Sequence, residues 1–283
     1  MEISRKSSTG LEQKIWLCEK PIEERDLHVN ILQENENLLE QDKQKYSNSI
    51  FLPSWGEIVL ALSGLNPNIN PANLTLIEST SYHVQAIRKR KVNDITPITV
   101  LGLILTSDEK LIAGIRGGDS SRDYVNLVPG GYVSNNKSPE NSNPIFASFY
   151  RELTEETGLE DKETLDCRMI GFQTDPFFGN LCLLFKGKTK RESFELYDSH
   201  RKSFEVYRNS INEGKNELDA RKSIEDAGFK NTDAWENTEL LFIDYKSIEE
   251  IIHSGKIGHK GKEYSFLDNS IGALMAYHLI KLK

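Results

Sequence analysis

Arg151, Glu152, Glu155 and Glu156 form a dense charged cluster that is suited to chemistry. Carboxylates on adjacent turns of a helix repel one another, and acids lie unfavourably in the last turn, where the helix dipole is negative. A hard divalent cation such as Mg²⁺ would offset both effects, because it binds carboxylate oxygens together with substrate phosphates and water. The cluster therefore favours a metal site for displacement at phosphorus. The alternative is a solvated acidic helix face in which Arg151 pairs with Glu155.

The helix that must carry these acids has clear ends in the sequence. Asn143 is a suitable N-cap, Pro144 suits the first helical position, and Gly158 suits the left-handed residue after the last turn. Successive residues are separated by about 100° around a helix, so the acids and the hydrophobic residues fall on separate faces. The face predicted to enter the core consists of Phe146, Phe149 and Leu153.

The pattern Arg-Glu-Leu-x-Glu-Glu-x-Gly-Leu, from Arg151 to Leu159, resembles the signature of the Nudix hydrolase family. Gly130 and Gly131 precede it at a predicted strand end, as in that signature. The order of two strands, a Pro-Gly-Gly turn, this helix and further strands is also similar to the Nudix α/β/α sandwich. The resemblance covers residues 95–283 and implies an α/β fold with a mixed sheet.

The resemblance implies hydrolysis of the pyrophosphate in a nucleoside diphosphate linked to another group. It implies Glu155 and Glu156 as the main ligands of Mg²⁺, for which Mn²⁺ can substitute. Glu152 would join them or polarise the attacking water, Gly131 would offer its backbone carbonyl to a metal, and Arg151 would orient the acids.

The sequence departs from the family pattern before the helix. The loop between Gly131 and Arg151 is longer than the pattern has, and Asn143 stands where the pattern has a glutamate. Glu140 is the nearest acid that could replace it. The departure leaves two readings open, a metal site with fewer ions or a Nudix-like domain that binds nucleotide with little catalysis.

The general base is not fixed by the signature. Glu236 and Glu239 lie just before a predicted strand, and each is a candidate base or a plain surface acid. We take Glu236 as the candidate catalytic residue.

The substrate requires cationic groups for its diphosphate and a flat apolar surface for its base. Arg116 and Arg122 lie just before the glycine turn, and Phe177 and Phe178 lie in a turn after the acidic helix, where one ring could stack on a base or sugar. We predict these four as substrate-binding residues, with a surface ion pair as the alternative for Arg116.

Two substrate classes remain open from the sequence. The long loop before the signature and the N-terminal extension are similar to the Nudix branch that hydrolyses UDP-sugars, which favours a nucleoside diphosphate sugar. An ADP-ribose or dinucleotide pyrophosphatase is the competing enzyme, supported by Pro176 downstream of the signature.

The patterns of hydrophobic and turn-forming residues predict the domains and elements of the rest of the chain. Residues 1–93 are predicted as a smaller N-terminal α+β region of unknown role, and residues 94–283 as the Nudix hydrolase domain with a helical insertion at about 190–234. Within these, residues 55–65 are predicted as a buried helix, 75–91 as an edge strand and 253–264 as a mobile connection. Strands are predicted within residues 97–118, 123–133, 165–174, 180–188 and 240–245, and a final helix within 266–282.

The composition excludes several functional classes. The 283 residues carry a formal net charge of -8, which argues against binding of nucleic acid or an anionic membrane. The three cysteines are widely spaced and indicate neither a disulfide framework nor a zinc site. No signal peptide or membrane-spanning run is evident. We therefore expect a cytoplasmic protein that binds a small nucleotide derivative, and a homodimer through the N-terminal region is compatible with the sequence.

Overall fold

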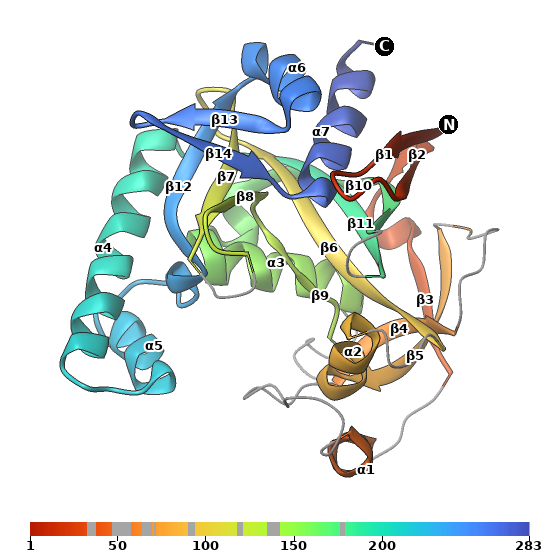
Figure 1. The fold of residues 1–283 in the computed structure, drawn as a ribbon, viewed down its shortest axis with the longest axis horizontal. Coiled ribbons are helices and arrows are strands. Elements are labelled where there is room, and N and C mark those ends of the chain that lie inside the picture. The colour runs from red at the N-terminus through yellow and green to blue at the C-terminus, as the bar shows by residue number, and fades with distance from the viewer. Residues whose placement is uncertain are drawn as a thin grey trace. The chain divides into compact units, whose positions relative to one another are not determined.

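The computed structural model describes residues 1–32, 38–46, 58–63, 70, 72–89, 94–117, 121–134, 142–175 and 179–282 (Figure 1). Strand pairs in these residues are both parallel and antiparallel, and helices are interspersed with the strands. The predicted α/β class with a mixed sheet is therefore confirmed. None of the described helices is both long and apolar enough to cross a lipid bilayer.

The chain forms two compact units, each assembled from three segments. Unit 1 comprises Met1–Val100, Gly131–Ser148 and Met169–Leu184, and unit 2 comprises Leu101–Gly130, Phe149–Arg168 and Phe185–Lys283. The predicted boundary near residue 93 stays a prediction. The elements with residues in both units are β6 (Ile95–Leu105), β9 (Gly130–Tyr132), α3 (Pro144–Thr157), β10 (Thr164–Asp175) and β11 (Asn180–Thr189).

Unit 1 contains the N-terminal strands. Its elements are β1 (Glu2–Lys6), β2 (Glu12–Ile22), η1 (Glu24–Asp26), β3 (His28–Ile31), α1 (Leu38–Tyr46), β4 (Ile58–Ser63), β5 (Asn73–Thr80) and α2 (Ser81–Arg88). β1 pairs with β2, which pairs in turn with the second half of β10. β3 runs parallel to β5, and β4 lies antiparallel to both β5 and the start of β6.

Two predictions within unit 1 are wrong. Residues Ile58–Ser63, predicted as helical, form the strand β4, in which Val59 to Leu62 are all buried. A short run buried on both faces shows no alternation, so periodicity does not separate strand from helix. The predicted edge strand of residues 75–91 ends at Thr80. The Thr80 side chain accepts a hydrogen bond from the His83 backbone N–H at 3.1 Å and so caps α2.

Unit 2 contains the acidic end of α3 and the C-terminal elements. Its other elements are β7 (Lys110–Arg116), β8 (Tyr124–Leu127), η2 (Asp161–Glu163), α4 (Ser193–Asn212), α5 (Glu217–Asp226), η3 (Ala234–Glu236), β12 (Asn237–Asp244), α6 (Tyr245–Ser254), β13 (Lys256–His259), β14 (Lys262–Phe266) and α7 (Asp268–Lys281). β7 pairs antiparallel with β8 and β12, and β14 runs parallel to β8.

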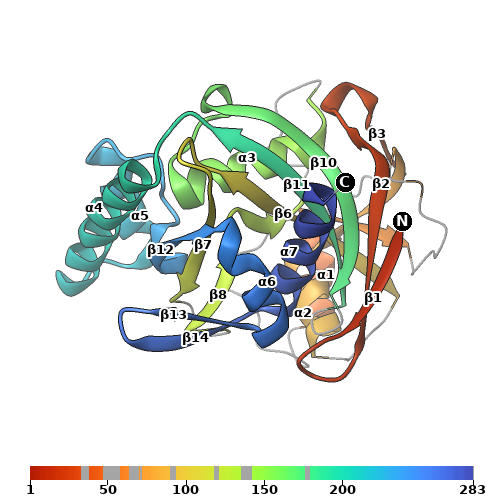
Figure 2. The same ribbon diagram turned by 90° about the horizontal axis from the view of Figure 1, so that it is seen from above.

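Helices cover both sides of the strands in unit 2. α3 packs on β11 through the stacked rings of Phe149 and Phe185, whose centroids lie 4.5 Å apart. α7 packs on β8, where the Ser270 hydroxyl accepts a hydrogen bond from the Leu127 backbone N–H at 2.9 Å. Figure 2 shows α3 and α7 on opposite sides of β6 and β11. The predicted α/β/α layering is therefore confirmed.

Most predicted elements of unit 2 are confirmed, with one exception. Residues 253–264, predicted as a mobile connection, contain the hairpin β13–β14. Its turn places Lys260 at φ 49° and Gly261 at φ 79°. Positive φ at both central residues matches the right-handed twist of the strands, and glycine adopts it without steric cost. The predicted strands and helices that are confirmed are β6, β7, β8, β10, β11, β12, α3 and α7.

Candidate active site

Helix α3 begins and ends as its sequence predicts. The Asn143 side-chain oxygen accepts hydrogen bonds from the backbone N–H groups of Ile145 at 3.0 Å and Phe146 at 3.4 Å, so Asn143 is the N-cap. Gly158 has φ 77° and donates its N–H to the Thr154 carbonyl at 2.8 Å. The core face is at most 1% exposed and consists of Ile145, Phe146, Phe149 and Leu153. This anchoring fixes the acids on the other faces.

Arg151 holds two of the three acids. Its Nη2 lies 2.7 Å from Glu152 Oε1, and its Nη1 lies 3.2 Å from Glu155 Oε2. All three side chains are mostly shielded from solvent, with exposures between 12% and 26%. The arginine is therefore placed to orient the acids. The Arg151–Glu155 ion pair is also what the alternative interpretation, an acidic helix face without a metal, predicts.

Glu156 differs from its two neighbours. The residue is 1% exposed, and neither carboxylate oxygen has a partner at full hydrogen-bond geometry among the described residues, although the Gly130 backbone N–H is close enough to favour the charged form. Burial raises the pKa of Glu156 well above its usual range, and the nearby charges of Glu236 and Glu152 raise it further. Arg116 and the Gly130 backbone oppose this shift. A buried carboxylate without partners is costly, so Glu156 favours either a proton or a cation.

Glu236 lies beside this buried acid and is held by Arg116. Arg116 Nη2 lies 3.3 Å from Glu236 Oε2, and the Gly117 backbone N–H donates to the Glu236 carbonyl at 2.8 Å. The register between β7 and β12 shifts between Asn237 and Glu239, which marks a β-bulge at the start of β12. Bulges re-aim side chains next to functional sites. Arg116 therefore takes part in an ion pair, and its predicted role in substrate binding stays a prediction.

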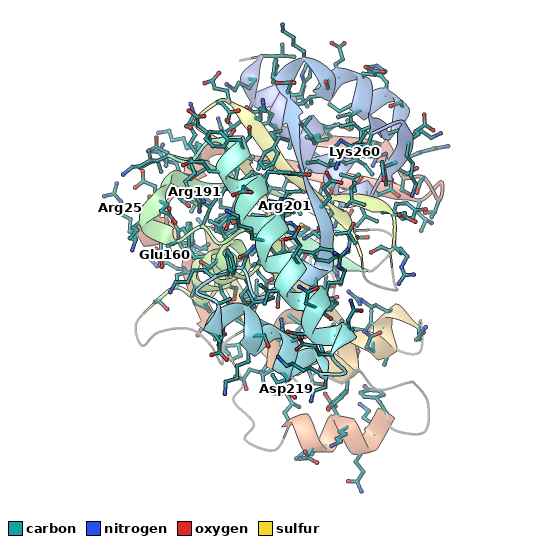
Figure 3. The ribbon with its side chains drawn as sticks, turned by 90° about the vertical axis from the view of Figure 1, so that its left-hand side faces the viewer. Arg25, Glu160, Arg191, Arg201, Asp219 and Lys260 are labelled. Atoms are coloured by element: carbon teal, nitrogen blue, oxygen red, sulfur yellow. The ribbon has the colours of Figure 1, made fainter. Side chains whose placement is uncertain are left out.

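Glu239, the other candidate base, is already paired. Its Oε1 lies 3.1 Å from His259 Nε2, 2.5 Å from Lys260 Nζ and 3.2 Å from the Tyr197 hydroxyl. Burial opposes ionisation of Glu239, but the hydrogen bonds from Lys260 and His259 outweigh it and lower the pKa of Glu239. Lys260 lies at the tip of the β13–β14 hairpin (Figure 3). Glu236 is among the charges that act most strongly on Glu156.

The remaining predicted site residues lie on other elements or outside the described residues. Arg122 lies in the turn before β8, and Gly131 lies in β9. Their predicted roles stay predictions. Phe177, Phe178, Pro176 and Glu140 lie outside the described residues.

The donor atoms of this cluster fit a hard cation. Glu152, Glu155 and Glu156 supply carboxylate oxygens, the ligands that Mg²⁺ prefers. The unpartnered oxygens of Glu156 are open to a ligand without loss of any hydrogen bond. Within the described part of the chain, no three or more His, Cys, Asp or Glu side chains are already arranged around a metal position. A cation at this place would share the carboxylates of Glu152 and Glu155 with Arg151 or take one of them from it.

Sequence reasoning did not find the residues that hold Glu236 in place. Asp233 donates its backbone N–H to the Glu155 carbonyl at 2.8 Å and accepts from the Glu236 N–H at 2.9 Å. Its carboxylate pairs with Arg221. Asp at the residue before a helical turn is a favoured cap, which is the one sequence signal that marks this position.

Comparisons with known proteins find structural likenesses only. No family model and no curated protein sequence matches the chain. Tm1382 is 11% identical, with coverage of 80% of this chain and 100% of that chain and a TM-score of 0.41. The MutT protein from Methanosarcina mazei Go1 is 12% identical, with coverage of 66% and 96% and a TM-score of 0.36. A NUDIX family hydrolase from Clostridium perfringens is 13% identical, with coverage of 65% and 97% and a TM-score of 0.30. We draw no functional conclusion from likenesses this distant.

Proposed function

We propose that the protein is a Nudix-type, Mg²⁺-dependent pyrophosphohydrolase. The observation that carries this proposal is Glu156, a buried carboxylate with no partner at full hydrogen-bond geometry among the described residues, whose pKa is raised by burial and by the charges of Glu236 and Glu152. An acid in that position is unfavourable for folding alone. Its presence within the pattern Arg151–Leu159 is explained if a cation and an anionic substrate complete the site.

The metal would be held by Glu152, Glu155 and Glu156, with the Gly131 carbonyl as a further ligand. Mn²⁺ would bind to the same oxygen ligands. When bound, such an ion supplies charge stabilisation to the phosphoryl oxygens and orients water for displacement at phosphorus. Arg151 would then release one carboxylate to the ion and keep the other oriented.

Glu236 is the residue we assign to proton transfer. Its carboxylate is 28% exposed, which leaves it accessible to water, and Arg116 keeps it oriented beside Glu156. A general base must lie within hydrogen-bond reach of the proton it accepts, and the short turn would hold Glu236 in one place for that role. Glu239 cannot take this role without breaking its contacts to Lys260, His259 and Tyr197.

The substrate we propose is a nucleoside diphosphate linked to another group, with a nucleoside diphosphate sugar as the first choice. Arg122 would contact the diphosphate, and Phe177 or Phe178 would stack on the base or sugar. An ADP-ribose or dinucleotide substrate is the second choice, because the acid cluster binds the diphosphate that all of these share.

The test is release of products from UDP-glucose and ADP-ribose, measured with Mg²⁺, with Mn²⁺ and with a chelator. We expect at least one of the two substrates to be hydrolysed, and only when the ion is present. We expect Glu156→Gln to lose this hydrolysis. Glu160→Gln is the matched control, because Glu160 follows the same helix but its carboxylate pairs with Lys162 at 2.5 Å (Figure 3). Turnover that is unaffected by the chelator, or equal in Glu156→Gln and Glu160→Gln, would contradict the proposal.

A nucleotide-binding regulator with little catalysis is the second candidate, and one observation favours it. Asn143, which replaces a glutamate of the family pattern, is fully used as a helix cap and as a hydrogen-bond donor to the Leu27 carbonyl at 2.8 Å. Asparagine has no carboxylate, and its amide oxygen is already used by the cap, so Asn143 does not replace the missing acid. Tight binding of nucleotide sugars by the wild type without turnover of any of them would select this candidate.

A further inference from the structure

The turn that carries Glu236 connects α5 to β12. Within this turn, the Glu236 backbone N–H donates to the Asp233 carbonyl at 2.9 Å, and the Glu236 carbonyl accepts from the Gly117 N–H at 2.8 Å. The side chain adds the contact to Arg116 at 3.3 Å. The position of the Glu236 carboxylate is therefore set by where residues 229–237 lie, and not by Glu236 alone.

Asp233 joins three parts of unit 2. Its side chain is 8% exposed and forms an ion pair with Arg221 of α5. Its backbone N–H donates to the carbonyl of Glu155, between two acids of α3, and its backbone carbonyl accepts from Glu236. Because these bonds share one residue, a shift of Asp233 relative to α5 also changes the spacing between Glu236 and the acids of α3.

Helix α4 holds the same turn from a second direction. Asn231 Nδ2 donates to the Ser203 hydroxyl at 2.6 Å. The ring of Trp235 stacks on Tyr207, with centroids 6.2 Å apart and planes 21° from parallel. The helical pair α4–α5 thus provides side-chain contacts on both sides of Asp233.

We propose that the helical pair α4–α5 is the positioning element for Glu236, and that Arg221 is a positioning residue that acts through Asp233. This inference rests on the proposed function for the catalytic importance of Glu236, but the placement of the turn is independent of it. Arg221 touches none of the acids of α3 in its ion pair, so its effect is exerted through the turn. A long, planar cation is suited to this place, since it spans from α5 to a buried carboxylate.

Hydrogen exchange of backbone amides tests the placement of the turn without metal or substrate. In Arg221→Met, we expect the Asp233 and Glu236 amides to exchange about tenfold faster than in the wild type, because the turn opens more often. Arg201→Met is the matched control. Arg201 lies on α4 (Figure 3) and pairs with Asp198 at 3.1 Å and Glu205 at 3.0 Å, with its side chain 49% exposed. Its removal should leave both amides unchanged.

Exchange rates within twofold of the wild type in Arg221→Met, or an equal increase in Arg201→Met, would overturn the proposal. If Arg221→Met does not fold, Asp233→Asn decides by the same measurement, because it keeps the shape of the side chain and removes its charge. Arg221→Lys, which keeps the charge, should restore slow exchange in part.

Kinetics separate this proposal from the proposed function. On a substrate that the wild type hydrolyses, Arg221→Met should lower kcat about tenfold with KM within about twofold, because the binding groups stay in place and only Glu236 is displaced. A rise in KM with unchanged kcat would overturn the positioning role. Faster exchange in Arg221→Met together with a wild type that hydrolyses no nucleotide would instead refute the proposed function and leave the structural role of Arg221 standing.

Discussion

Glu156 and Glu239 are the same residue type in opposite surroundings within unit 2. Glu239 accepts from Lys260, His259 and Tyr197; burial raises the pKa of Glu239, but the contacts to Lys260 and His259 outweigh it and lower the pKa. Glu156 is more deeply buried, has no partner at full hydrogen-bond geometry among the described residues, and has its pKa raised by that burial. Glu239 ties a hairpin to a helix and a strand. A buried acid with so few partners is unfavourable for folding, which supports our proposal that Glu156 is kept for a ligand.

The largest expected effect comes from Glu156→Gln, which removes the charge and keeps the shape. We predict that hydrolysis falls by a factor on the order of 10³, because an oxygen ligand of the proposed ion is lost. We also predict that the free energy of unfolding rises by about 1 kcal/mol, because glutamine needs neither to take up a proton nor to bury a charge when the metal-free chain folds. Product release measures the change in hydrolysis, and urea unfolding of the metal-free protein measures the change in the free energy of unfolding. A loss of stability in this variant would remove the contrast with Glu239.

The second prediction extends the contrast to His200, a buried histidine whose Nε2 also has no partner among the described residues. Burial lowers the pKa of His200 to about 4. The unfolded chain therefore binds this proton at higher pH than the folded chain, so stability is lost as pH falls from about 6.5 to about 4. The loss should amount to about 3 kcal/mol. In His200→Gln, unfolding free energies measured across this range should vary less with pH than in the wild type. The same dependence of unfolding free energy on pH in both proteins would contradict this role of His200.

The smallest expected effect is that of Glu239→Gln. We predict a lower midpoint of urea unfolding, since three donors lose their charged acceptor, and hydrolysis within a few-fold of the wild type, since the Glu239 carboxylate is engaged by Lys260, His259 and Tyr197. The opposite signs of the stability changes in Glu156→Gln and Glu239→Gln sharpen the comparison. A loss of hydrolysis in Glu239→Gln as large as that in Glu156→Gln would place both acids in one site.

The sequence predicts the acidic helix well because its signals are local. The cap at Asn143, the glycine at Gly158 and the hydrophobic face are each defined within a few residues, and all three are present in the structure. The predictions for β4 and α2 failed because their local patterns are ambiguous. The run Val59 to Leu62 is buried on both faces, and the cap at Thr80 lies inside a stretch that alternates like a strand.

The pairing of the acids could not be predicted in the same way, because it depends on contacts between distant residues. Arg116 and Glu236 are 120 positions apart, and His259 lies 20 positions from Glu239. Nothing in the local sequence distinguishes Glu236 from Glu239 as a candidate base. The distinction comes from the bulge at the start of β12 and from a hairpin that the sequence suggested was a mobile connection.

A titration with Mn²⁺, followed by the electron paramagnetic resonance signal of the unbound ion, tests the central claim most directly. We predict that the wild type and Glu239→Gln bind Mn²⁺ with similar affinity, and that Glu156→Gln binds it at least about tenfold more weakly, because the buried carboxylate is a ligand. Equal binding by all three proteins, or no binding by the wild type, would contradict the assignment of Glu156 as the acid kept for a metal ion.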